Sequence, residues 1–115
     1  CGDVRAIIPD MIEIGADALN LNQPRLLGID ELADRFRGAT CFICPVDTQT
    51  TIIKGTSLDI RKEARELVQK LGSVKGGFIA CCDEGIDHGY VPIDNIREMG
   101  KAFEEYAFLA STPTD

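Results

Sequence analysis

Helix-like and strand-like patterns of apolar residues alternate along this chain of 115 residues. Apolar side chains recur at intervals of three and four positions in four segments, which predicts amphipathic helices over residues 4–14, 30–37, 57–71 and 92–107. Three short segments between these helices predict β-strands, at residues 17–22, 40–44 and 77–82. The last two strands are continuous apolar runs, which is typical of strands covered on both faces.

Local signals indicate where some of these helices begin. Thr56 and Asp59 have the spacing of a capping box before the third helix. Asp30 is a candidate N-cap for the second helix. Pro9 interrupts the first helical pattern, because proline lacks an amide donor, so we expect this helix to kink or to begin near Ile8.

The alternation of helices and strands predicts an α/β fold with a parallel sheet and helical crossovers. Three strands are too few to bury such apolar edges, and a closed (β/α)8 barrel needs about 250 residues. We therefore expect the last three or so βα units of a TIM barrel, with residues 1–115 forming a C-terminal segment of one barrel domain and residues 109–115 forming a frayed tail. The abrupt start at Cys1 leads to the same expectation, that the chain begins inside a larger fold. A complete, small flavodoxin-like sheet is the alternative.

Composition and charge exclude several classes of protein. The formal net charge is −7 and there is no basic stripe, so neither nucleic acid nor an anionic membrane surface is expected as the main partner. No apolar run reaches the roughly 18 residues of a transmembrane helix. Five cysteines, two of them adjacent, do not form a secreted disulfide framework, so we expect a reducing, cytoplasmic setting.

Polar side chains follow each predicted strand, where parallel α/β folds bind their ligands. A long predicted loop, residues 45–55, follows the second strand. The candidate substrate-binding residues are the amide side chains after the first two strands, namely Asn20, Asn22, Gln23 and Gln49. The candidate catalytic residues are the carboxylates after the second and third strands, Asp47 and Glu84. Turn-forming roles for the residues of the second loop, and a solvated loop carboxylate for Glu84, are the alternatives.

Nearly the whole chain resembles the C-terminal third of the uroporphyrinogen decarboxylase superfamily. The resemblance rests on five segments in the family's order, Cys1-Gly2-Asp3-Val4, residues 8–20 (Ile-Pro-Asp-Met-Ile-Glu-Ile-Gly-Ala-Asp-Ala-Leu-Asn), Pro45-Val46-Asp47-Thr48-Gln49, Gly76-Gly77-Phe78-Ile79-Ala80 and Val91-Pro92-Ile93-Asp94-Asn95-Ile96. The resemblance implies a TIM barrel. It also implies one of two chemistries, a metal-free porphyrinogen decarboxylation or a zinc-dependent methyl transfer that serves corrinoid proteins or thiols.

The residues at the family's metal positions favour the methyltransferase branch. Cys1-Gly2 matches the Cys-Gly of the family's His-x-Cys-Gly zinc motif, and the His would lie two residues upstream of this chain. Glu84 stands where the decarboxylase has His and the thiol methyltransferases have Cys. Glutamate is a competent zinc ligand, and three protein ligands with one open position are typical of catalytic zinc. The resemblance thus implies zinc held by Cys1, Glu84 and the upstream His.

A metal with one thiolate fewer is more Lewis acidic, which suits an ether or amine leaving group. We therefore expect a methyltransferase that moves a methyl group from a methoxylated or methylated small molecule to a separate corrinoid protein. The other expected partner is the rest of the barrel, or a second copy that associates through open strand edges. The runner-up is the decarboxylase itself, an enzyme of porphyrin biosynthesis, with Glu84 or Asp47 as proton donor. A non-catalytic module that docks a corrinoid protein is the third hypothesis.

Overall fold

Three parallel strands form one sheet at the centre of the computed structural model, which describes residues 2–82 and 91–108. The strands are β1 (Ala18–Asn20), β2 (Cys41–Cys44) and β3 (Phe78–Ala80), in the spatial order β1-β2-β3. The predicted α/β class and parallel sheet are therefore confirmed. The strands are shorter than the segments predicted from the sequence.

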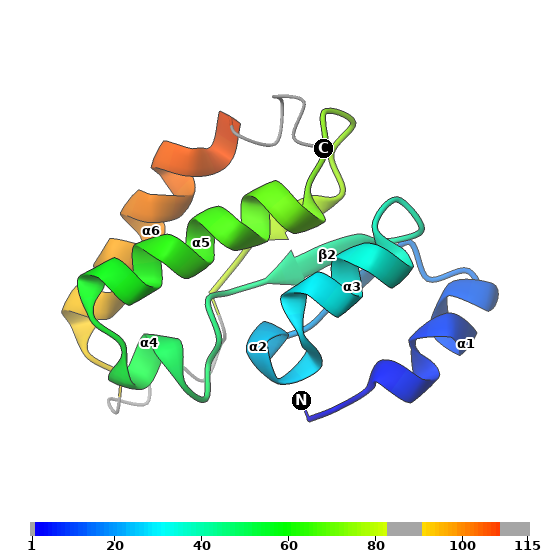
Figure 1. Ribbon diagram of the computed structural model, residues 1–115, viewed down its shortest axis with the longest axis horizontal. Coiled ribbons are helices and arrows are strands. Elements are labelled where there is room, and N and C mark those ends of the chain that lie inside the picture. The colour runs from blue at the N-terminus through cyan, green and yellow to red at the C-terminus, as the bar shows by residue number, and fades with distance from the viewer. Residues whose placement is uncertain (1, 83–90, 109–115) are drawn as a thin grey trace.

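Helices occupy the connections before, between and after the strands (Figure 1). In chain order the helices are the 3-10 turn η1 (Arg5–Ile7), α1 (Ile8–Glu13), α2 (Pro24–Leu27), α3 (Ile29–Phe36), α4 (Thr51–Lys54), α5 (Ser57–Leu71) and α6 (Ile93–Tyr106). The start of α1 at Ile8 confirms the effect expected of Pro9, which takes the first turn of the helix, where its missing amide donor costs nothing. The Thr56–Asp59 capping box is also confirmed, because each side chain accepts the other residue's backbone N–H.

Two connections contain short helices that the sequence analysis did not predict. Pro24 begins α2 directly after the first strand. The predicted loop 45–55 contains α4, which Gly55 ends. The expectation that Asp30 caps the second helix is wrong, because α3 begins one residue earlier with Gly28 as its N-cap.

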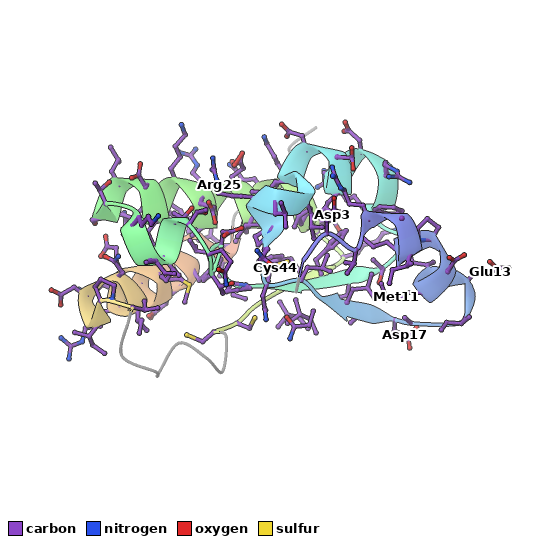
Figure 2. All side chains as sticks on the ribbon, turned by 90° about the horizontal axis from the view of Figure 1, so that it is seen from below. Asp3, Met11, Glu13, Asp17, Arg25 and Cys44 are labelled. Atoms are coloured by element: carbon purple, nitrogen blue, oxygen red, sulfur yellow. The ribbon has the colours of Figure 1, made fainter. Side chains whose placement is uncertain are left out.

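One face of the sheet packs against helices. Figure 2 shows the strands along one side of the molecule, with α1, α3 and α5 on the other side. Leu19 and Phe42 are paired across β1 and β2 and are buried, and Phe78 continues the row on β3. The predicted stripe on α5 is buried with them, and its residues are Ile60, Ala64, Leu67, Val68 and Leu71. This single layer of helices on a sheet holds the hydrophobic core.

The other face of the sheet is largely uncovered, and we call it the open face. Asn20, Ile43 and Ile79 lie side by side on it in register, and the Ile79 side chain is 51% exposed. Within residues 2–82 and 91–108, the prediction that the second and third strands are covered on both faces is therefore wrong. Apolar side chains stand on both faces of these strands, and this pattern is the reason that the sequence predicted burial on both faces.

No helix in the two described ranges is both long and apolar enough to span a bilayer. The predicted frayed tail, residues 109–115, lies outside the described residues.

The open face predicts self-association of residues 1–115 when they are produced alone, since each unpaired strand edge and exposed apolar patch favours contact. Ile79→Lys should reduce the apparent mass at high concentration and change the free energy of unfolding by less than about 1 kcal/mol, because the side chain is half exposed. Leu58→Lys is the control, since Leu58 is exposed on α5. Light scattering after gel filtration measures the mass. A monomer with a sharp melting transition would contradict the prediction.

Candidate functional site

The segments that follow β1 and β2 are fastened to each other at the carboxyl edge of the sheet. The Thr48 backbone N–H and side-chain hydroxyl both donate to the Asn22 carbonyl oxygen, at 3.2 and 3.1 Å. The Arg25 backbone N–H donates to Asp47 Oδ2 at 3.1 Å. These bonds bring together two of the predicted site segments, because Gln23 and Gln49 lie beside the bonded residues in the chain.

Asp47 is the polar centre of this connection and is 1% exposed. Its Oδ1 accepts the backbone N–H groups of Gln49 and Thr50, at 2.9 and 3.1 Å, and the Thr50 hydroxyl at 3.1 Å. A carboxylate that accepts local N–H groups fixes a turn, which is the alternative role considered for this residue. The Asp47 carboxylate thus shapes the loop from within, and its catalytic role stays a prediction.

Glu63 on α5 is a second buried carboxylate, and the sequence analysis missed it. It is 2% exposed, and its Oε2 accepts the Asp47 backbone N–H at 2.6 Å. Its Oε1 accepts the Thr51 hydroxyl at 2.7 Å and lies 3.4 Å from Arg25 Nη1. The signal was present in the sequence, because position 63 falls within the apolar stripe of α5, three residues after Ile60. A charged residue inside such a stripe indicates a buried polar contact.

Burial raises the pKa of the Glu63 carboxyl above its ordinary value, because removal from water disfavours the charged form. The hydrogen bonds from Asp47 and Thr51 oppose this shift. The positive charge of Arg25 also lowers the pKa of Glu63, but by less than these hydrogen bonds do, and the Arg25 side chain is 57% exposed. Hydrogen bonds from Asp47 and Thr51 therefore hold the Glu63 carboxyl group in a place that water hardly reaches.

The amide side chains after β1 lie in different surroundings. Asn20 is exposed on the open face. Asn22 is partly buried, and its Oδ1 is enclosed without a hydrogen-bond partner in the described part of the chain. Gln23 Oε1 accepts the Gly2 backbone N–H at 2.6 Å, so the first described residue lies at the carboxyl edge. On the second loop, Gln49 is exposed.

A groove of about 260 Å³ runs along the edge of β1 that faces away from β2. Six consecutive residues, 18–23, line one wall. Val4, Ile7 and Met11 line the opposite wall. The outer edge of β1 therefore faces the apolar side chains of the N-terminal segment across this groove.

The structure does not test the predicted metal site. Cys1 and Glu84, its two ligands within this chain, lie outside the described residues. Among residues 2–82 and 91–108, no three His, Cys, Asp or Glu side chains are placed to hold a metal ion. Cys41 and Cys44 lie on opposite faces of β2, and burial raises the pKa of the Cys44 thiol far above its usual range. That thiol belongs to the core.

Comparison with known proteins gives no match to any protein-family model, curated protein or solved structure. The sequence pattern and the geometry of the carboxyl edge therefore carry the functional argument.

Glu63→Gln should lower the free energy of unfolding by about 1–3 kcal/mol, because the amide nitrogen cannot accept a hydrogen bond, whereas both carboxyl oxygens accept one, from Asp47 and Thr51. The folded state keeps the Glu63 proton to a higher pH than the unfolded chain does. The contribution of Glu63 is thus fully present below its ordinary pKa and decreases as the pH rises through the raised pKa.

The loss caused by Glu63→Gln should therefore be larger in acid than at neutral pH. Denaturant unfolding over a pH series measures this difference. Glu104→Gln, at an exposed position of α6, is the control and should give a small difference at every pH. A Glu63→Gln difference that does not change with pH would contradict the assignment.

Proposed function

We propose that this chain is the C-terminal part of a TIM-barrel methyltransferase similar to the uroporphyrinogen decarboxylase superfamily. The enzyme moves a methyl group from a methoxylated or methylated small molecule to a corrinoid protein in the cytoplasm. The observation that carries the proposal is the one-sided sheet, whose polar residues gather at the carboxyl edge while one face stays uncovered. In a barrel, that edge forms the active site and that face forms the interior.

The free edge of β1 supports the barrel. A preceding parallel strand would lie in the groove between β1 and the apolar residues Val4, Ile7 and Met11. Such a strand would end at the carboxyl edge, where Gly2 contacts Gln23. Parallel sheets are normally covered, and β1 has neither a charged residue nor a proline to protect its edge. These features favour a fourth strand over a complete three-stranded domain.

Amide hydrogen exchange in the protein that contains this chain tests the fourth strand. Leu21 N–H donates to Ile43 O at 3.0 Å, whereas the Asn20 N–H points away from β2 because successive amides of a strand alternate in direction. Both amides should exchange slowly when a strand pairs with the edge of β1. Fast exchange at Asn20 with slow exchange at Leu21 would reject the barrel. Protection of Asn20 that grows with protein concentration would indicate a second copy instead.

The described residues have two roles in this proposal. Asp47 and Glu63 hold the loop after β2 in shape, so that Gln49 stays at the carboxyl edge. Asn20, exposed at the end of β1, offers a neutral hydrogen-bonding group to a small-molecule substrate. Zinc bound by Cys1, Glu84 and an upstream His would supply a Lewis acid for the heteroatom that carries the methyl group. Glu84 and Asp47 remain the proposed catalytic carboxylates.

Zinc analysis separates this proposal from its alternatives. The purified protein should hold about one zinc per chain, as in a three-ligand catalytic site, and Cys1→Ser should remove most of it. Cys41→Ser is the matched control, because Cys41 lies within β2 rather than at the carboxyl edge, and this variant should retain the metal. A metal-free protein that decarboxylates a porphyrinogen would establish the runner-up. Binding of a corrinoid protein without zinc or turnover would establish a docking module.

A further inference from the structure

A second groove, of about 570 Å³, lies between α2, α4 and α5 on the outer side of the carboxyl-edge loops. The charged residues that line this groove are three basic and three acidic side chains. Arg25 contributes from α2, Lys54 from the end of α4 and Lys62 from α5. Three cations from three separate helices therefore meet at one hollow, in a chain whose net charge is −7.

The three carboxylates that line this groove are all engaged by partners within the protein. Asp59 accepts the Thr56 N–H of the capping box. Glu63 accepts Asp47 N–H and the Thr51 hydroxyl. Glu66 pairs with Lys70 at 3.2 Å. Each of them therefore has at least one oxygen engaged within the protein, and Asp59 also feels the charges of Lys62 and Arg25.

Two of the cations have no such partner. Within the described ranges, no carboxylate oxygen lies within 4.0 Å of the Lys54 or Lys62 ammonium. Arg25 uses Nη1 toward Glu63, and its side chain remains 57% exposed beside α5 (Figure 2). The donors that remain in the groove are thus ammonium and guanidinium N–H groups. Such groups bind carboxylate and phosphate oxyanions, and the greater negative charge of phosphate strengthens its attraction to them.

We propose that the groove formed by Arg25, Lys54 and Lys62 binds a phosphate group. The site does not depend on the proposed methyl transfer, because it lies outside the sheet and every residue in it belongs to this chain. The ammonium groups of Lys54 and Lys62 supply most of the attraction. Arg25 adds hydrogen bonds while it keeps its contact with Glu63.

Calorimetric titration with inorganic phosphate tests the site, at an ionic strength held constant with sodium chloride. The double variant Lys54→Met/Lys62→Met should raise the Kd for phosphate about tenfold or more. Both lysines are exposed, so the variant should keep its melting temperature. Lys75→Met/Lys101→Met removes the same charge at exposed positions outside the groove and should leave the Kd unchanged.

Three results would overturn the proposal. One is the absence of phosphate binding beyond the effect of chloride. The second is an equal loss of binding in the two double variants, which would indicate attraction by overall charge. The third is acetate binding as strong as phosphate binding, which would assign the groove to carboxylates.

Discussion

The carboxyl edge of this sheet depends on a single short hydrogen bond, from the Asp47 backbone N–H to the buried Glu63 carboxylate at 2.6 Å. The bond joins the loop after β2 to the long helix α5. Asp47 in turn holds the backbone of Arg25, so the segment after β1 is fixed by the same interaction. Two carboxylates, both nearly inaccessible to solvent, thus order two loops by accepting backbone N–H groups. Together with the bonds from Thr48 to the Asn22 carbonyl, they hold the backbone of both loops at this edge.

The parts of the fold that sequence could predict are those decided by local pattern. The stripe on α5 and the capping box of Thr56 are local, and both are present. The short helices α2 and α4 escaped prediction, because four residues carry too little periodicity to be recognised. The exposure of the open face could not be predicted either. An apolar strand sequence indicates that its side chains are buried, but it does not indicate which part of a protein buries them.

The candidate site was predicted only in part, for a related reason. Alternation of strands and helices was enough to assign Asn22, Gln23 and Asp47 to one edge of the sheet. The contact of Glu63 with this edge joins residues 16 positions apart, and no short motif encodes it. The side chain of Asp47 looks catalytic in a sequence and is enclosed in the structure. That enclosure depends on long-range packing, which the local sequence around Asp47 does not encode.

The open face leaves an apolar surface of the described sheet accessible to a further layer of protein. Hydrophobic burial contributes about 25 cal/mol for each Å² of apolar surface removed from water, so covering Ile43 and Ile79 would stabilise a complex formed on this face. Split-protein complementation exploits surfaces of this kind. Under the barrel proposal, a polypeptide that supplied the preceding strands in trans would bind this face and the free edge of β1 with no linker between the two pieces.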